Sequence, residues 1–370
     1  MSDFILKEVS NIENELEQIG FDSSYLLQAE NKFRYKNIKV YGLSVAQANI
    51  LKQTALIFGA DCAVNRNVIT GNIAKSDVIL CGSYSQLNKI AQKLMSQPFR
   101  LAILGKNILE ILKPQIRRTK LVGILNVTPD SFSDGGKFFD KNSAEQHFIQ
   151  LLEDGADLID IGAESTRPGG AQAVSAKEQI ERLTSIIEFA EKENLTNRIS
   201  VDTRCAEVAD FVLNHGVKII NDVSGFDFDK KMPEIISKYK AGVILQHSTE
   251  RAEDYKEYKN IMETLFFSLK DKAELAKDNG IDNIIIDPGI GFGKIRKDNF
   301  IILDKIEELF GLNLPIMVGV SRKSLLGVET KDNELKDALS ASISYPLVKK
   351  GVDYLRVHNV KLSKALINLV

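Results

Sequence analysis

The sequence has little of several features that mark particular classes of protein. It has three cysteines, an odd number without the paired spacing of a zinc site, so we expect reduced thiols. No apolar run approaches the roughly 18 residues of a membrane span, and the start MSDFILKEVS lacks the basic and apolar segments of a signal peptide. A formal net charge of -2 gives no broad basic surface for nucleic acid. We therefore expect a cytoplasmic protein that binds neither nucleic acid nor membrane.

The chain does have enough apolar residues for a large core. Its 370 residues are 44% hydrophobic and 26% charged, which suits one large domain and a smaller one. Residues 1–115 predict a small N-terminal α/β domain of unknown role, with strands at 33–42 and 77–81 and helices at 45–58 and 83–95. A polar, basic stretch at 114–120 predicts a linker. The second domain is therefore expected at 116–370.

From residue 121 onward, short apolar runs alternate with amphipathic helical stretches. The expected strands are 121–127, 158–162, 199–202, 218–223, 242–246, 284–287, 316–320 and 355–357. The expected helices include 143–154, 175–193, 206–214, 255–279 and 333–350. Eight such units in about 250 residues match a (β/α)8 TIM barrel. A doubly wound open sheet is the alternative, because alternation alone does not exclude it.

Polar residues gather where the expected strands end. The stretch LVGILNVTPDSFSDGG (121–136) sets the pattern, since an apolar strand gives way at once to a polar, Gly-rich loop. In a barrel all these ends converge on the face that holds active sites. The residues in question are Asn126, Glu164, Ser165, Thr166, Arg167, Asp202, Thr203, Arg204, Asn221, Asp222, Gln246, His247, Asp287, Ser321, Arg322, Lys323, Arg356, His358 and Asn359.

Each of these residues also has a structural interpretation. Asp202 precedes a helix and could be its N-cap. Asn221 and Asp222 could do no more than hydrogen-bond a turn. His247 and His358, taken singly, are more often structural than catalytic. The hypothesis of a site therefore rests on the coincidence of eight strand ends.

The chemistry of the set narrows the ligand. Asp202, Asn221 and Asp287 suit a flat heterocycle with several N–H donors, because a carboxylate accepts parallel bonds from an aminopyrimidine-like edge. A second, cationic group suits phosphate or diphosphate. Asn126 offers a neutral oxygen of the kind Mg2+ accepts. The Gly-rich piece 289–293 predicts a tight loop beneath the ligand. The cationic group comprises Arg167, Arg322, Lys323 and Arg356, with His358.

Seven strings in this order resemble dihydropteroate synthase. They are ILNVTPDSFSDGG (124–136), DIGAESTRPGG (160–170), VDTR (201–204), INDVSG (220–225), DPGIGFGK (287–294), GVSRKS (319–324) and RVHNV (356–360). The resemblance covers residues 121–370 and leaves the N-terminal region outside the usual catalytic domain. It departs from the family at Gln246-His247-Ser248, where a Met-rich stretch is common, so a role for His247 stays open.

The resemblance implies a reaction and a set of roles. The amine of 4-aminobenzoate displaces diphosphate from 6-hydroxymethyl-7,8-dihydropterin diphosphate, with Mg2+ as cofactor, and the chain is expected to form a homodimer through its late helices. The catalytic residues would be Asp134, Asp202 and Lys323. The pterin would contact Asp202, Asn221, Asp287 and Lys323, and the diphosphate Asn126, Thr166, Arg167, Arg356 and His358. Phe132, Pro168 and Ser324 would border the aminobenzoate, and Asn126 would be the metal ligand.

Two rival functions remain. A pterin-binding methyltransferase shares the Asp and Asn contacts to the pterin but has no use for a diphosphate site. A catalytically idle homologue would bind pterin, or regulate a partner through its N-terminal region, without turnover. The SRKS and RVH strings favour the synthase over both.

Overall fold

The computed structural model describes residues 6–9, 12–113, 118–127, 141–164, 174–248, 257–328, 330 and 332–370. The chain divides into two compact units, Met1–Pro114 and Gln115–Val370. The two units have separate hydrophobic cores.

Unit 1 is a three-stranded antiparallel sheet packed on helices. The strands are β1 (Tyr35–Ser44), β2 (Asp61–Val64) and β3 (Lys75–Ser83), in the order β1-β3-β2. The helices are α1 (Ile12–Gln18), α2 (Leu26–Phe33), α3 (Val45–Ile57), α4 (Tyr84–Leu94) and α5 (Leu101–Leu112), with a 3-10 turn η1 (Ser23–Tyr25) before α2. Strand ends run directly into α3 and α4 because Ser44 and Ser83 form capping boxes with the glutamines three residues later. The sequence predicted β1, α3, β3 and α4 but not the other elements.

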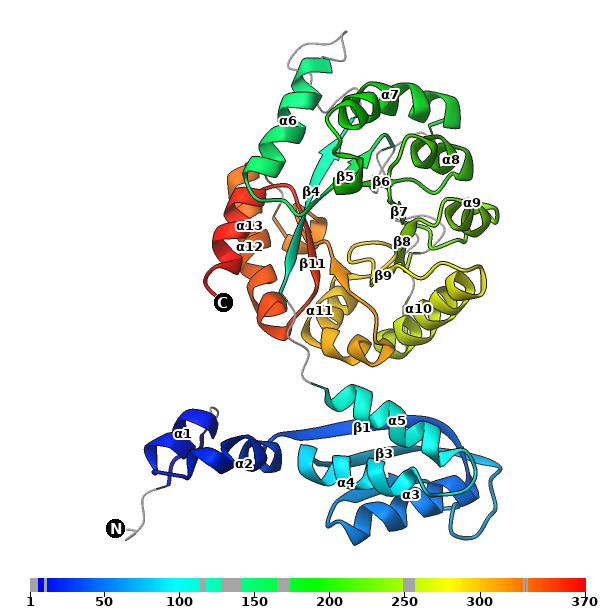
Figure 1. The fold of residues 1–370 in the computed structure, drawn as a ribbon, viewed down its shortest axis with the longest axis vertical. Helices are drawn as coiled ribbons and strands as arrows, with labels where there is room; N and C mark the ends of the chain where they lie inside the picture. Colours follow the sequence, from blue (N-terminus) through cyan, green and yellow to red (C-terminus); the bar gives the residue numbers. More distant parts are fainter. Residues whose placement is uncertain are drawn as a thin grey trace. The chain divides into compact units, whose positions relative to one another are not determined.

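Unit 2 is a ring of eight parallel strands surrounded by helices (Figure 1). Its strands are β4 (Lys120–Asn126), β5 (Leu158–Gly162), β6 (Ile199–Asp202), β7 (Ile219–Asp222), β8 (Gly242–Gln246), β9 (Ile284–Asp287), β10 (Met317–Val318) and β11 (Tyr354–Val357). The outer helices are α6 (Lys141–Glu153), α7 (Ala176–Lys192), α8 (Ala206–Asn214), α9 (Met232–Lys238), α10 (Ile261–Asp278), α11 (Arg296–Asp304), α12 (Asn333–Lys350) and α13 (Val360–Ile367). Shorter 3-10 turns are η2 (Thr196–Arg198), η3 (Ile306–Leu312) and η4 (Ser324–Leu326).

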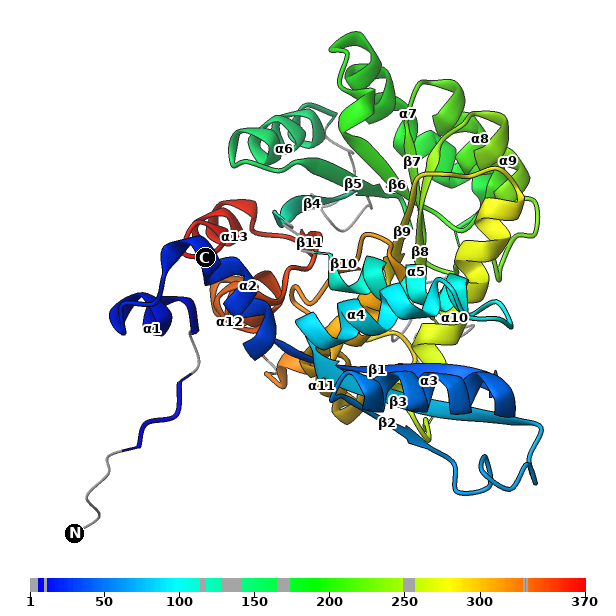
Figure 2. The same ribbon diagram turned by 60° about the horizontal axis from the view of Figure 1, so that its bottom comes forward.

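The sheet closes into a barrel. Strand order runs β10-β11-β4-β5-β6-β7-β8-β9, and a parallel bridge between Ile286 of β9 and Ile316, just before β10, joins the two ends. The Ile286 amide also donates to the Pro315 carbonyl at 2.9 Å. A second view shows the helices outside the strands (Figure 2). The expected (β/α)8 barrel with an additional N-terminal unit is confirmed, and the open doubly wound sheet is excluded.

The inside of the barrel changes from apolar to polar along the strands. One layer is an apolar cluster of Val122, Leu158, Ile244, Ile285 and Met317, with Ile219 and Tyr354 packed against it. Side chains two residues apart on a strand point to the same side. The next inward positions on β5, β7, β8, β9 and β11 are therefore Asp160, Asn221, Gln246, Asp287 and Arg356. The apolar layer closes one end of the barrel, and the polar layer faces the carboxyl ends of the strands.

Candidate active site

A network of buried charges crosses the barrel at the start of its polar layer. Arg356 of β11 donates from Nε to Asp160 Oδ2 at 2.6 Å and from a terminal nitrogen to Asp202 Oδ2 at 3.0 Å. The same Asp160 oxygen accepts from Asn221 Nδ2 at 2.9 Å. Ser200 of β6 donates to the other Asp160 oxygen at 2.6 Å. Residues from four strands thus share one hydrogen-bonded network.

Burial sets the ionisation of Asp202. The pKa of this carboxyl rises to about 7 because it is removed from water, although the Arg356 guanidinium pulls it down; the neighbouring Asp160 carboxylate adds to the rise. Asp202 ends β6, and α8 begins after an N-cap at Cys205, so Asp202 is not the helix cap. A carboxyl that exchanges its proton near neutral pH can accept N–H bonds from a ring or release them.

Asp287 and Lys323 form a second pair on the opposite side of the barrel. Burial raises the pKa of Asp287 while the Lys323 ammonium lowers it. Removal from water lowers the pKa of Lys323 to about 8, against the pull of Asp287. Lys323 donates to the Ile290 carbonyl at 2.6 Å and lies 4.6 Å from the centre of the Phe292 ring. This pair offers a ligand one acceptor group and one donor group.

The Gly-rich loop after β9 is shaped from beneath by a buried lysine. Lys294 is 1% exposed and donates to the carbonyls of His247, Gly289 and Phe292, each at 2.9 Å. Burial lowers its pKa to about 7, opposed by Asp287. Gly289 has a φ of +66°, and a Cβ there would lie 2.0 Å from the His247 carbonyl oxygen. The glycine is therefore required by the close approach of two backbones.

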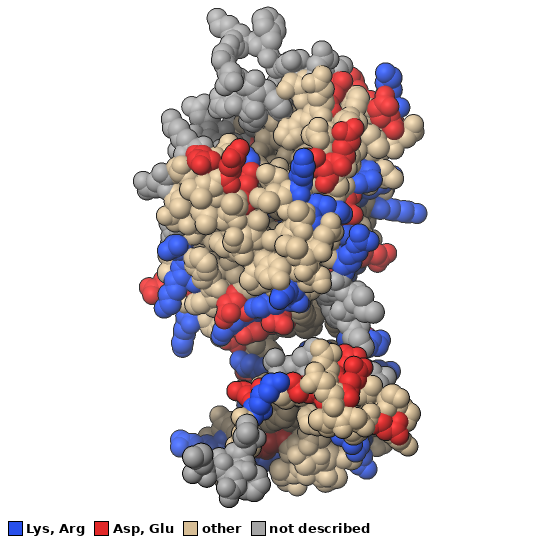
Figure 3. Space-filling view, turned by 90° about the vertical axis from the view of Figure 1, so that its left-hand side faces the viewer, with Lys and Arg blue, Asp and Glu red and all other residues tan. Residues whose placement is uncertain are grey.

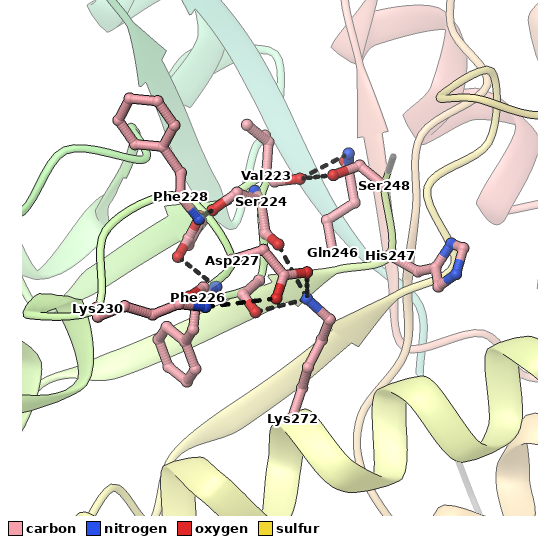
Figure 4. A network of polar contacts seen from close by, with 12 residues as sticks. Val223, Ser224, Phe226, Asp227, Phe228, Lys230, Gln246, His247, Ser248 and Lys272 are labelled. Carbon is pink, nitrogen blue, oxygen red and sulfur yellow. Dashed lines mark hydrogen bonds and ion pairs between the residues drawn. The ribbon is translucent and has the colours of Figure 1, made fainter. Parts of the chain in front are cut away.

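Hydrogen bonds among its own residues and from Lys272 hold the loop after β7 (Figure 4). Asp222 accepts from the Ser224 amide and hydroxyl and from the Phe226 amide at 2.7–2.9 Å. From α10, Lys272 donates to the Ser224 and Gly225 carbonyls and to Asp227. The turn interpretation is thus correct for Asp222, whereas Asn221, its neighbour, points into the barrel.

The turn after β10 carries Lys323 and has its own anchor. Arg322, with a φ of +57°, makes two bonds of 2.7 Å to Asp337 of α12. Arg322, expected among the cations that suit phosphate, instead binds this helix through its guanidinium. Ser321 shares a hydrogen bond of 2.9 Å with His358 Nδ1 and accepts from the His358 amide. His358 is thereby held two residues beyond Arg356.

Asn126 ends β4 beside the same group. A Cβ built on Gly162 would lie 3.5 Å from Asn126 Oδ1 and 3.7 Å from the Asp202 Cβ, so Asn126 and Asp202 flank this glycine. Ser324 begins η4 at the rim and is exposed. Eight predicted site residues therefore lie at or just beyond the carboxyl ends of strands, and they are Asn126, Asp202, Asn221, Asp287, Lys323, Ser324, Arg356 and His358. The other five, Phe132, Asp134, Thr166, Arg167 and Pro168, lie outside the described residues.

Sequence reasoning missed three residues of this site. Asp160 lies in the middle of β5 and not at its end, although an acidic residue inside the apolar string LIDIG was a signal. Phe292 and Lys294 lie in the loop that was predicted only as tight. Their contacts depend on how that loop folds over Lys323 and His247, which residue spacing does not encode.

Charged side chains of both signs are mixed on the described surface. On the side shown in Figure 3, Lys and Arg side chains alternate with Asp and Glu, and neither sign forms a continuous field. No helix of the described residues is long and apolar enough to cross a membrane. The three cysteines are free thiols.

Comparison with known proteins identifies the family. Residues 122–358 match the family model of the pterin binding enzymes. A dihydropteroate synthase of Clostridium beijerinckii is 42% identical over 247 residues, which are 66% of this chain and 90% of the relative. A bifunctional dihydropteroate synthase/dihydropteroate reductase of Helicobacter pylori is 32% identical over 361 residues, 94% of this chain and 93% of the relative.

A solved structure agrees with both. The dihydropteroate synthase of Clostridium difficile, crystallised in the presence of pteroic acid, superposes with a TM-score of 0.64 at 38% identity, over 68% of this chain and 95% of that one. The expected transferase of folate biosynthesis is thereby confirmed in family, fold and enzyme class. The chain belongs to the dihydropteroate synthase family of pterin-binding enzymes.

Proposed function

We propose that the mouth of the barrel joins 6-hydroxymethyl-7,8-dihydropterin diphosphate to 4-aminobenzoate, with release of diphosphate. One observation carries the assignment of the site: Asp202, Asn221, Asp287, Lys323 and Arg356 face one space from five different strands or strand ends. Acceptors for a flat N–H-rich ring and cations for a diphosphate are thus adjacent. Only the two groups together account for a substrate that carries both a pterin ring and a diphosphate.

The pterin ring is assigned to the acceptor side. Asp202 and Asp287 accept N–H bonds, the Asn221 oxygen accepts a further one, and Lys323 donates to a ring acceptor. The roles of Asp202 and Lys323 as catalytic residues follow from the same positions. The Asp202 carboxylate also favours positive charge that develops on the pterin methylene as the C–O bond breaks. Asp134 is proposed to share this electrostatic role.

The diphosphate is assigned to Arg356 and His358, with Thr166 and Arg167 as further contacts. Negative charge grows on the leaving group, so these donors stabilise the transition state more than the ground state. Asn126 fits a Mg2+ site, because its side-chain oxygen is a neutral ligand of the kind that Mg2+ accepts and lies beside Gly162, which Asp202 also adjoins. No three His, Cys, Asp or Glu side chains of the described residues could hold a metal by themselves. Mg2+ bound there with diphosphate oxygens would neutralise leaving-group charge.

The aminobenzoate is assigned to the rim. Phe132, Pro168 and Ser324 are proposed to border its ring and carboxylate. Phe292 adds an aromatic face next to Lys323, 4.6 Å from that ammonium. We propose that diphosphate departs before the N–C bond is fully formed, because the cations stabilise the leaving group and the Asp202 carboxylate stabilises the positive charge on the methylene. Isotope effects at the methylene equal to those of direct displacement would exclude it.

Diphosphate release tests the reaction itself. The purified chain with pterin diphosphate and Mg2+ should release inorganic diphosphate only when 4-aminobenzoate is added, in equal amount to dihydropteroate. A methyltransferase or an idle homologue would release none. Arg356→Ala serves as the matched control, because it keeps the acceptor side and removes the main cation.

A second activity is proposed for the whole chain. The Helicobacter pylori relative is named as a dihydropteroate reductase as well as a synthase, and its match covers 94% of this chain and so extends into unit 1. Reduction of dihydropteroate needs a hydride and a proton, so the full chain should form tetrahydropteroate with a reduced nicotinamide or a reduced flavin. Absence of tetrahydropteroate with both donors would restrict the chain to synthesis.

Assembly and location are proposed as well. A homodimer through the late helices is supported by the 40% exposure of Phe300 on α11 and the 44% exposure of Leu335 on α12. Light scattering should give twice the mass of 41.2 kDa, and Phe300→Lys with Leu335→Lys should give the monomer. A cytoplasmic location agrees with the free thiols.

A further inference from the structure

Asp160 is a fully buried ionisable group of the site. It has no exposed surface and lies in the middle of β5, in register with Ser200, whereas the next inward residue, Gly162, is in register with Asp202. Asp160 is thus one layer below Asp202, next to the apolar layer that closes one end of the barrel. A buried carboxylate is tolerated only where other groups satisfy it. Its partners come from three strands: Ser200, Asn221 and Arg356.

The bond to Asp160 fixes the direction of the Asn221 amide. Nδ2 donates to Asp160 Oδ2 at 2.9 Å, so Oδ1 points away from the carboxylate. That oxygen is buried and has no hydrogen-bond partner among the described residues. An unmet buried acceptor costs about 1–3 kcal/mol, which a ligand N–H would recover. An ionised carboxylate only accepts hydrogen bonds, so it does not allow the amide to turn over.

The same oxygen orients Arg356. Oδ2 accepts from Arg356 Nε at 2.6 Å, and a terminal nitrogen of the guanidinium then meets Asp202 in the next layer. Because the guanidinium is planar, a bond at Nε and one at a terminal nitrogen fix its plane. A single carboxylate oxygen therefore sets two groups on which the site depends, one for each half of the substrate.

We propose that Asp160 is a positioning residue, which turns the Asn221 oxygen toward the pterin and holds the Arg356 guanidinium toward the diphosphate. It acts through these side chains and does not need to touch the substrate. The proposal rests on the proposed function, since it assumes that the pterin lies against Asn221. Binding of the free pterin alcohol separates the two: if the unaltered chain does not bind it, the proposed function fails, and if binding is unaffected by Asp160, only this proposal fails.

A double-mutant cycle tests the action through Asn221. Affinity for 6-hydroxymethyl-dihydropterin is measured by calorimetry for the unaltered chain, Asp160→Ala, Asn221→Ala and the double variant. Asp160→Ala should weaken binding about tenfold, the loss of one well-aligned hydrogen bond. The double variant should bind no worse than Asn221→Ala alone, because the oriented amide is already gone. If the loss of affinity in the double variant equals the product of the losses in the two single variants, Asp160 does not act through Asn221 and the proposal is wrong.

Two further variants separate positioning from stability. Asp337→Ala removes another buried carboxylate, 6% exposed, that contacts neither Asn221 nor Asp160, so its effect on affinity should multiply with that of Asn221→Ala. Asp160→Asn keeps an acceptor oxygen for Asn221 and Arg356 and should bind the alcohol within about threefold of the unaltered chain. Loss as large as that of Asp160→Ala would contradict the orienting role. Asp160→Ser, which admits water and keeps a hydroxyl, replaces Asp160→Ala in the cycle if the alanine variant does not fold.

Discussion

Truncation of Arg356 should separate binding of the diphosphate from binding of the ring. The side chain is 19% exposed and reaches both Asp160, at 2.6 Å, and Asp202, at 3.0 Å. A hydrogen bond to a charged group is worth about 1.5–3 kcal/mol. Arg356→Ala should therefore weaken binding of pterin diphosphate about tenfold to about 150-fold. The free alcohol has no phosphate to lose and should change much less.

The same substitution should lower stability. Removal of one partner from a buried ion pair costs about 3–5 kcal/mol, because the remaining charge stays buried. Since Arg356 keeps some exposure and Asp160 retains Ser200 and Asn221, we expect a loss near the lower end of that range. Urea denaturation measures this loss of stability. Binding is measured without urea, on variants shown to be folded.

Arg356→Lys is the matched control for charge. It keeps one positive charge but cannot contact two carboxylates through a planar guanidinium. Its affinity for pterin diphosphate should therefore lie between that of the unaltered chain and that of Arg356→Ala. The assay is calorimetry with pterin diphosphate and with the alcohol on all three proteins. If Arg356→Ala weakens both ligands by the same factor, Arg356 is structural and the assignment of the diphosphate side is wrong.

Three further predictions follow from the site. Burial raises the pKa of Asp202 to about 7 and lowers that of Lys323 to about 8. As the pH rises, pterin affinity should therefore increase while Asp202 loses its proton and then decrease while Lys323 loses its own. An affinity without this maximum, or an Asp202→Asn variant that keeps the increase on the acid side, would contradict the assignment. Chelation of Mg2+ should abolish diphosphate release but not binding of the alcohol. Asn126→Ala should raise the Mg2+ concentration needed for half-maximal rate about tenfold, which corresponds to the loss of one ligand contact. An unchanged Mg2+ requirement would exclude Asn126 as a ligand. Gly289→Ala should cost more than about 2 kcal/mol of unfolding free energy, because its Cβ would meet the His247 carbonyl at 2.0 Å, whereas Gly311→Ala, with 3.4 Å to Phe266, is the mild control.

The barrel was predictable because its signals are local and repeated. Each strand is a short apolar run that ends in polar residues, and the count of such units sets the fold. Unit 1 was less predictable. Its β2 is four residues long, and α5 follows a left-handed Arg100 that has no capping side chain, so neither element carries a strong boundary signal.

The site was predictable where position along a strand decides direction. Asp202, Asn221 and Arg356 were placed correctly because carboxyl ends of parallel strands converge. Arg322 was expected to suit phosphate but binds an adjacent helix, and Asp222, which had two interpretations, binds an adjacent turn. Those partners are fixed by tertiary packing.

Asp160 is a site residue that its position along the strand did not reveal. Its position in the interior of β5 lies outside the strand-end pattern on which the expected site depends. Only the barrel brings Ser200, Asn221 and Arg356, from 40, 61 and 196 residues away, to the same carboxylate. An isolated acidic residue within a fully buried strand is therefore a useful signal for a buried polar network.

A structure of the chain with pterin diphosphate tests the central claim most directly. The ring should lie between Asp202, Asn221, Asp287 and Lys323, with the Asn221 Oδ1 accepting a ring N–H and the diphosphate at Arg356 and His358. A ligand bound elsewhere, or a ring turned so that its diphosphate lies away from Arg356, would contradict the account.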